Sequence, residues 1–325
     1  MKKLCTLLAL IMLLTCVPMS GCTTEPEPNP VSDFEYEISE DHRAVYILKY
    51  IGTSENVILP SEIDEIPVRA LKGITGADGI EHEGVFEGTN VTSVIIPDSV
   101  NAVGKDAFYG CSKLTHVTFL GNASSIGSHA FENCTALQSI DLSTTKNESI
   151  GSSAFRNCSA LEKIKFSNDL TVIGQFAFYD CTSLVELIFP QSLTTIEREA
   201  FINCTSLKEI HVPTMLDLFS MDSVRFHNNP ALEKIVFAEG RTEITGYAFF
   251  DTTTNVEVTV PSSVEKFSSA PFFAHGSITF KFLGDCPISI ENEEFYGTPT
   301  ILYMPNTKGW DNCVWQDKYS LIPVQ

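Results

Sequence analysis

The sequence predicts a β-rich α/β solenoid of about ten coils, because one phenylalanine returns at a nearly fixed interval along most of the chain. Successive members of the series lie 22 to 25 residues apart. A period of this length is typical of one supersecondary unit that stacks on copies of itself. The ten phenylalanines are Phe86, Phe108, Phe131, Phe155, Phe178, Phe201, Phe226, Phe249, Phe272 and Phe295.

Each central repeat reads I-x-x-x-A-F-x-x-C-x-x-L-x-x-I-x-[FLV], as in IGSSAFRNCSALEKIKF from residue 150. Its end alternates apolar and polar positions, so we expect one short strand per repeat with Ile164 and Phe166 pointing inward. Strands about 23 residues apart cannot pair as hairpins, which predicts a parallel sheet along the solenoid. The A-F-x-x-C segment is expected to form a short helical or 3₁₀ turn. Prolines that lack the N–H needed for sheet pairing follow several strands: Pro97, Pro190, Pro213, Pro261 and Pro305.

The repeat resembles the BspA-type, or Treponema-type, leucine-rich repeats of bacterial surface proteins, over roughly residues 34 to 325. The resemblance rests on A-F-x-x-C-x-x-L-x-x-I, which recurs five times almost unbroken at this period. It implies a leucine-rich-repeat solenoid that adheres to host proteins, neighbouring-cell proteins or matrix components. The chain divides into a lipoprotein signal peptide (1–21), a Pro-rich acidic tether (22–32), an N-terminal cap (33–80), the repeats (81–305) and a C-terminal cap (306–325).

The two ends of the solenoid are expected to be closed. FEYEI at 34–38 and AVYILKYIG at 44–52 read as a hairpin, and the residues after it resemble the family's N-terminal cap. The last residues resemble its C-terminal cap, with Trp310 and Trp315 covering the last coil. Closed ends prevent aggregation through an open strand edge.

The N-terminus predicts export and lipid attachment. Lys2 and Lys3 precede an apolar run over residues 4–17, which is too short to span a membrane as a helix. Small residues directly before Cys22 resemble a bacterial lipobox, so Cys22 is the predicted lipidation site, with ordinary signal cleavage nearby as the alternative. The protein is therefore expected outside the cytoplasm, lipid-anchored to the cell envelope.

Charge limits the classes of partner. The formal charge is −20, and because the signal contributes two lysines and no acids, residues 22–325 carry −22. Such a chain is repelled by nucleic acid and by anionic lipid. We therefore expect no nucleic-acid partner and contact with a membrane only through the lipid anchor.

Five cysteines recur at one repeat position, and we expect them to form a buried ladder of free thiols. Equivalent side chains on adjacent coils point in the same direction, whereas a disulfide needs Cβ atoms that converge. Cys286 and Cys313 lie outside this series, and a bridge between them near the C-terminal cap stays open. The ladder cysteines are Cys111, Cys134, Cys158, Cys181 and Cys204.

The sequence predicts no enzyme, no cofactor and no metal site. It contains no H-E-x-x-H, G-x-S-x-G, Walker loop or C-x-x-C. His116 and His211 fall at outward strand positions without a partner at ligand spacing, so we interpret them as solvated surface histidines.

The outward strand positions are the candidate binding surface. Lys163 and Lys165 form a positive patch in a negative protein, beside Glu186, Glu209 and His211. We therefore expect recognition there of an extracellular protein, a matrix component or a glycan.

Two other functions stay open. Aromatic residues follow several repeat phenylalanines and would stack on sugar rings if exposed, which would suit glycan capture for nutrient uptake, although aromatic pairs between coils are the commoner explanation. A structural spacer in the cell envelope would self-associate without a soluble ligand. The aromatic residues are Tyr109, Tyr179, Phe250, Phe273 and Tyr296.

Overall fold

The structure, a computed structural model, describes residues 27–75, 82–216, 225–244, 249–252, 255–268, 272–274, 277–291 and 299–324. The predicted signal peptide, Cys22, Phe295 and Tyr296 lie outside these residues. Across the described ranges, no helix combines the length and the apolarity needed to cross a membrane.

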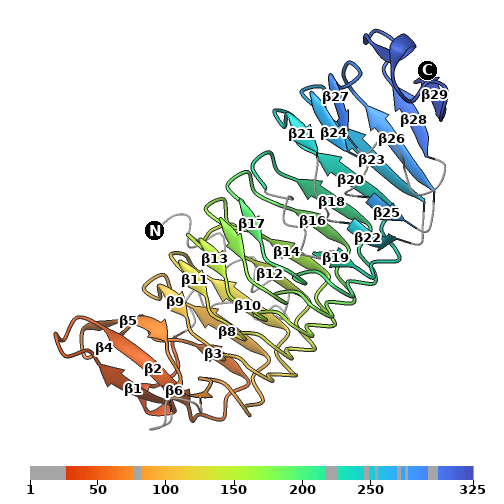
Figure 1. The fold of residues 1–325 in the computed structure, drawn as a ribbon. Helices are drawn as coiled ribbons and strands as arrows, with labels where there is room; N and C mark the ends of the chain where they lie inside the picture. The colour runs from red at the N-terminus through yellow and green to blue at the C-terminus, as the bar shows by residue number, and fades with distance from the viewer. Residues whose placement is uncertain are drawn as a thin grey trace, which may run out of the picture.

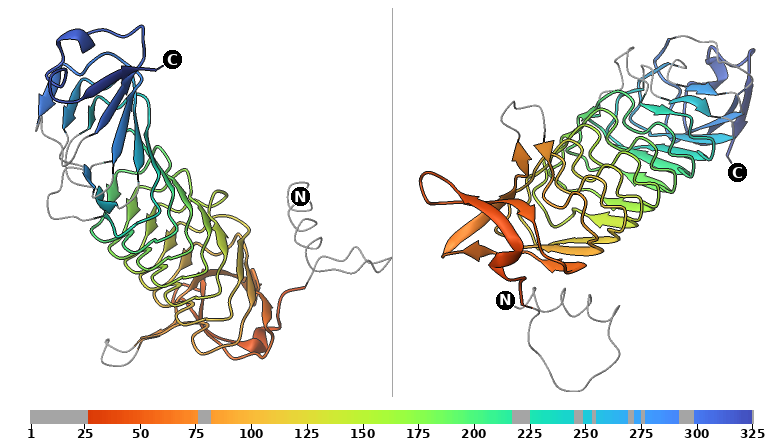
Figure 2. Two further views of the ribbon diagram at one scale, coloured as in Figure 1. Left: turned by 90° about the vertical axis from the view of Figure 1, so that its right-hand side faces the viewer. Right: turned by 90° about the horizontal axis from the view of Figure 1, so that it is seen from below.

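The described strands stack into an elongated solenoid, with the first strands at one end and the last at the other (Figures 1 and 2). Its coils carry the predicted parallel strands, and their side chains alternate between the interior and the surface. In β14 (Lys163–Lys165), for example, Ile164 is buried between two exposed lysines. The β-rich solenoid with parallel sheets is therefore confirmed.

We call the set of strands at the ends of the repeats the main sheet. Its hydrogen-bonded groups follow one another along the solenoid and run β3-β8-β10, β12-β14 and β16-β18-β20-β23-β26-β28-β29. The strands are β3 (Asn56–Ile58), β8 (Ser93–Ile96), β10 (His116–Phe119), β12 (Ser139–Asp141), β14, β16 (Glu186–Ile188), β18 (Glu209–Val212), β20 (Lys234–Phe237), β23 (Val256–Val260), β26 (Ile278–Phe282), β28 (Thr300–Tyr303) and β29 (Ser320–Pro323).

The prediction of one strand per repeat was wrong, because most coils carry a second short strand. These strands end at the repeat isoleucine or its equivalent, and being mostly two residues long they show no alternation in the sequence. They are β5 (Ile66–Leu71), β9 (Ala102–Val103), β11 (Ser125–Ile126), β13 (Ser149–Ile150), β15 (Val172–Ile173) and β17 (Thr195–Ile196), then β21 (Glu243–Ile244), β24 (Lys266–Ser268) and β27 (Ser289–Glu291).

The A-F-x-x-C segment forms consecutive turns in the central coils, at residues 152–157 for example, where a short helix was expected. Ser153 and Asn157 both have a φ of 57°, and a left-handed residue on each side of Phe155 interrupts helical geometry. In later coils the segment is extended, as β19 (Phe226–His227), β22 (Phe249–Thr252) and β25 (Phe272–Ala274).

The second residue after each repeat phenylalanine is left-handed in seven coils, which explains its identity. Glycine, asparagine and aspartate tolerate this conformation best. The repeat N-x-S/T sequences therefore follow from backbone geometry. The residues are Gly88, Gly110, Asn133, Asn157, Asp180, Asn203 and Asn228.

The phenylalanines form a continuous stack through the interior. From Phe86 to Phe226, neighbouring rings lie 4.8 to 5.2 Å apart and within 9° of parallel. Adjacent backbones also approach closely, since a Cβ added at Gly127 would lie 2.6 Å from the carbonyl carbon of Gly104. Glycine after the repeat isoleucine thus permits the coil spacing.

Both ends are closed. At the N-terminus, η1 (Val31–Asp33) leads into an antiparallel hairpin of β1 (Phe34–Ile38) and β2 (Val45–Tyr50), which confirms the predicted hairpin. Three short strands complete this end: β4 (Glu62–Ile63), β6 (Ile74–Thr75) and β7 (His82–Glu83). At the C-terminus, η2 (Trp310–Asn312) precedes Trp315, which is buried and packs edge-on against Phe267 at 5.5 Å.

Candidate functional site

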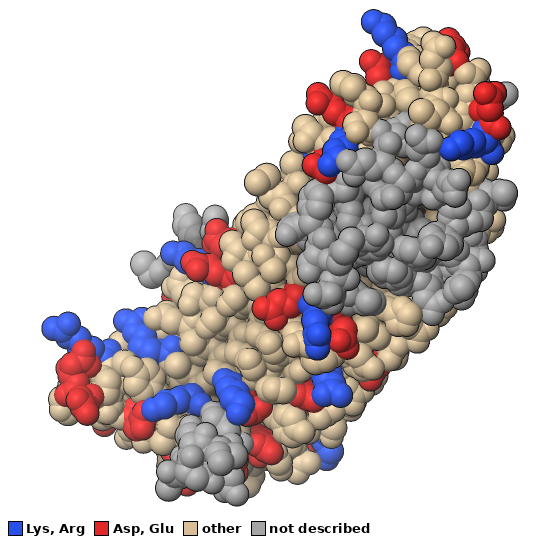
Figure 3. Space-filling model, viewed as in Figure 1, with Lys and Arg blue, Asp and Glu red and all other residues tan. Residues whose placement is uncertain are grey.

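The outward side chains of the main sheet stand in register from coil to coil. Asp141 lies opposite Lys165, and Glu209 lies between Glu186 of the preceding coil and Lys234 of the next. Two columns of side chains therefore run along the sheet, each with neighbours from other coils. On the face shown in Figure 3, basic side chains lie beside acidic ones.

The predicted positive patch is partly neutralised. The Nζ of Lys165 lies 2.7 Å from Oδ2 of Asp141, although both side chains are mostly exposed, at 71% and 49%. Partial burial acts to raise the pKa of Asp141, but hydrogen bonds from Lys165 and Ser143 outweigh it and hold this pKa below its ordinary value. Lys163 is exposed and forms no ion pair within the part of the chain that the structure describes.

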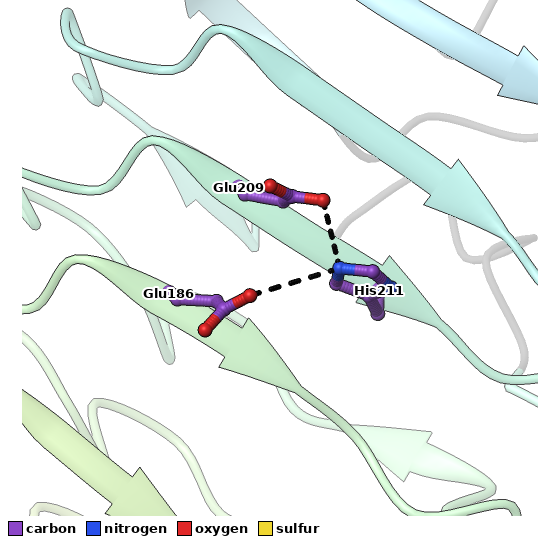
Figure 4. Close-up of side chains that lie close together, drawn as sticks. All are labelled: Glu186, Glu209 and His211. Atoms are coloured by element: carbon purple, nitrogen blue, oxygen red, sulfur yellow. Dashed lines mark ion pairs between the residues drawn. The ribbon is translucent and has the colours of Figure 1, made fainter.

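Glu209 is the centre of a charge network (Figure 4). Its Oε1 lies 2.8 Å from the Nζ of Lys234 and 2.8 Å from the Nε2 of His211. The same histidine nitrogen lies 3.8 Å from Oε1 of Glu186 on the preceding coil. The hydrogen bond from Lys234 is the main cause of the lowered pKa of Glu209. The expectation that His211 lacks a partner was therefore wrong, because the coil register places two carboxylates beside it.

Three of these residues have side chains that metal ions favour. Glu186, Glu209 and His211 each present one ligand atom, and the three atoms lie within 4.8 Å of one another. The ammonium of Lys234 already contacts the Glu209 oxygen, so positive charge is supplied there by the protein itself. We therefore interpret the cluster as an ion-pair network, and no metal is needed to explain its geometry.

A shallow hollow of about 450 Å³ lies on the main sheet beside this network. Four glutamates and two lysines line it, which leaves a formal charge of −2 at neutral pH. Next to it, Ile188 is 58% exposed at the position opposite His211. The lining residues are Val185, Glu186, Lys208, Glu209, Glu233, Lys234 and Glu257.

Sequence reasoning included Glu186, Glu209 and His211 in this surface but missed Lys234. The interval from Glu209 to Lys234 is 25 residues, two more than the usual repeat. Their pairing becomes visible only when the strands are aligned by their alternation, and that alignment was the one signal available in the sequence.

The aromatic surface considered for glycans is only partly described. Tyr179 is half-buried, its ring packs edge-on against Phe176 at 5.8 Å, and the Arg156 guanidinium lies over it at 5.5 Å. Tyr109 is also half-buried, whereas the side chains of Phe250 and Phe273 lie outside the description. The Tyr179 ring therefore has protein on two sides.

The five repeat cysteines are buried and free. Each thiol donates to the carbonyl oxygen of the phenylalanine one coil earlier, over 3.1 to 3.3 Å. Burial raises the pKa of Cys111 to about 12 and raises the pKa of each of the other four thiols. They are thus protonated at neutral pH, which suits packing and opposes nucleophilic chemistry.

Comparison with known proteins identifies a family. The description of the BspA type leucine rich repeat region matches residues 78–208 and 148–279, in six copies, and so covers more than half of the chain. No curated protein matches the chain.

Solved leucine-rich repeat structures also align with the chain. One from T. pallidum is 25% identical, with 69% of this chain and 86% of that protein covered and a TM-score of 0.45. A leucine rich cell surface protein from Faecalibacterium prausnitzii is 19% identical, with 94% and 96% covered and a TM-score of 0.43. A Bacteroides capillosus protein is 26% identical, with 46% and 97% covered and a TM-score of 0.30.

Proposed function

Because this chain belongs to the family of BspA-type leucine-rich repeat proteins, we propose that it is a lipid-anchored bacterial surface protein that recognises another protein through its main sheet. The anchor is the lipid on Cys22, and the acidic, Pro-rich residues after it hold the solenoid away from the membrane. The role is binding, and the partner is an extracellular or matrix protein.

The observation that carries this proposal is an exposed isoleucine beside an acidic hollow. Ile188 leaves most of its surface in water, and Glu186 belongs both to the hollow and to the network around His211. An apolar contact surrounded by charged side chains is a common arrangement at protein interfaces. The charge of the hollow favours a partner that presents lysine or arginine there.

A protein partner is better supported than a glycan. Glycan stacking needs an open aromatic face, and the ring of Tyr179 already contacts Phe176 and Arg156. The glycan function and the envelope spacer therefore remain outcomes of the binding experiment.

The experiment displays the full chain on bacterial cells and captures partners from libraries of extracellular proteins, matrix components and glycans. Glu186→Lys should weaken the dissociation constant of a captured protein about tenfold, with a smaller loss at high salt. Glu148→Lys is the matched control, because Glu148 is an exposed glutamate beside β13 of the second set of strands. Equal effects of the two variants, or capture of glycans alone, would contradict recognition of a protein by the main sheet.

Anchoring is tested separately. The wild-type chain should incorporate radioactive fatty acid and partition with membranes, and Cys22→Ala should lose both properties. If Cys22→Ala keeps both, the anchor lies elsewhere, whereas the binding experiment remains interpretable.

A further inference from the structure

Two cysteines outside the ladder meet at the C-terminal end of the solenoid. Cys286 follows β26, and its backbone N–H donates to the carbonyl oxygen of Lys308 over 2.8 Å. The N–H of Lys308 in turn donates to Oδ1 of Asp285 over 2.7 Å. A Cβ added at Gly309 would lie 3.2 Å from the Cβ of Cys286. The chain that leads into the cap is thus held directly against the turn that contains Cys286.

Cys313, which ends η2, completes the contact. The Cys286 thiol donates a hydrogen bond to the sulfur of Cys313. Both residues line one surface hollow of about 480 Å³ together with Asn312 and Val314, so a reagent in solvent can approach them.

The chemistry of this pair differs from that of the ladder. The hydrogen bond from Cys286 lowers the pKa of Cys313 to about 7, and the same contact raises the pKa of Cys286. About half of Cys313 is therefore thiolate at neutral pH, and its neighbour holds a proton ready to be released. Burial keeps the five ladder thiols protonated.

We propose that Cys286 and Cys313 form a disulfide after export, which joins the last coils to the C-terminal cap; this rests on the extracytoplasmic location proposed above. The oxidant is the disulfide of a thiol oxidoreductase. The Cys313 thiolate attacks one sulfur of that disulfide and releases the other as a thiolate. Cys286 then loses its proton and attacks the Cys313 sulfur, which releases the second thiolate. Two electrons and two protons pass from the cysteine pair to the oxidant, which becomes a dithiol.

A bridge here acts where a solenoid is weakest. The last coil contacts a neighbour on one side only, so the cap must stay in place to cover it. Trp310 and Trp315 pack against Phe282 at 5.0 and 5.9 Å, and a bridge at residue 313 holds the segment between them. Closing the chain between residues 286 and 313 limits how far the cap can open.

The direct test uses reduced, purified full-length protein incubated with the disulfide form of a purified thiol oxidoreductase. Free thiols are then alkylated in denaturant and the chain is cleaved with trypsin. Cys286 falls in peptide 282–308 and Cys313 in peptide 309–318, with no other cysteine in either. We expect one linked species that separates on reduction, while the ladder peptides carry alkyl groups. Alkylation of both peptides after the incubation would overturn the proposal.

A second measurement separates a bridge from a packing role of the side chains. Cleavage of the native, oxidised protein after Lys308 should rise roughly tenfold or more on adding reductant. Cys286→Ser and Cys313→Ser should cleave at that raised rate, and reductant should not change it further. Cys181→Ser, a ladder variant, should keep the response to reductant. A rate in the wild-type protein that ignores reductant would contradict the bridge.

The location is tested by the same peptides. The chain is expressed with its own N-terminus in a bacterium whose periplasm contains a thiol oxidase, and the linked species should be recovered from cells without added oxidant. Recovery of reduced peptides from cells together with the linked species in the purified reaction would support the pair and overturn the export on which the proposed function depends.

Discussion

The Sγ of Cys158 donates a hydrogen bond to the carbonyl oxygen of Phe131, one coil earlier, over 3.1 Å. The same carbonyl accepts the backbone N–H of Cys134 in its own coil, also over 3.1 Å. Where the series of cysteines ends, the Nδ2 of Asn229 donates to the carbonyl oxygen of Phe201 over 3.1 Å. The position therefore requires a small donor that reaches the preceding coil, and asparagine meets this requirement as cysteine does.

Cys158→Ala should lower the free energy of unfolding by about 1 to 2 kcal/mol, because it removes this hydrogen bond and leaves a small cavity. Cys158→Ser should lose less, since the hydroxyl can donate to the same carbonyl oxygen. Urea unfolding of the two variants measures the difference. A serine variant no more stable than the alanine variant would show that the thiol contributes only by its volume.

The buried thiols should make stability fall in alkaline solution. Burial raises the pKa of Cys111 from 9.0 to about 12, so the native state keeps a proton that the unfolded chain releases. This contribution is complete below about pH 9 and is lost as the pH rises towards 12. Cys111→Ser should show a shallower loss of stability between pH 9 and 11 in urea unfolding. Parallel curves for the variant and the wild type would contradict the raised pKa.

Phe155→Ala should lower the free energy of unfolding by about 3 to 5 kcal/mol, the range for a filled aromatic core position. Phe155 is fully buried between rings at 5.1 Å on each side. Phe176→Ala is the control, since Phe176 is only half-buried and should lose less. A loss under about 1 kcal/mol for Phe155→Ala would mean that the stack does not support the core.

Lys163→Glu combined with Lys165→Glu tests the positive patch chosen from the sequence. The melting temperature should change little, because the contact of Lys165 with Asp141 is largely exposed. If the partner also contacts these lysines, the double variant should weaken its binding and raised salt should reduce that loss. Binding that is unchanged in this variant but weakened by Glu186→Lys would restrict the contact to the acidic hollow.

Much of this protein is written in its local sequence. The phenylalanine period, the alternation at Ile164 and Phe166, and the N-terminal hairpin could be predicted because each depends on neighbours a few residues away. The burial of alternate strand residues follows in the same way. These features determine the solenoid without any knowledge of how one coil meets the next.

The tertiary structure decided which residues of different coils meet. The contacts of Lys165 with Asp141, of His211 with Glu186 and of Glu209 with Lys234 all cross between coils, over 23 to 25 residues of chain. A period that varies by one or two residues does not determine which side chains lie opposite each other. Strand pairing sets that register, because a shift of one residue would turn every apolar side chain outward.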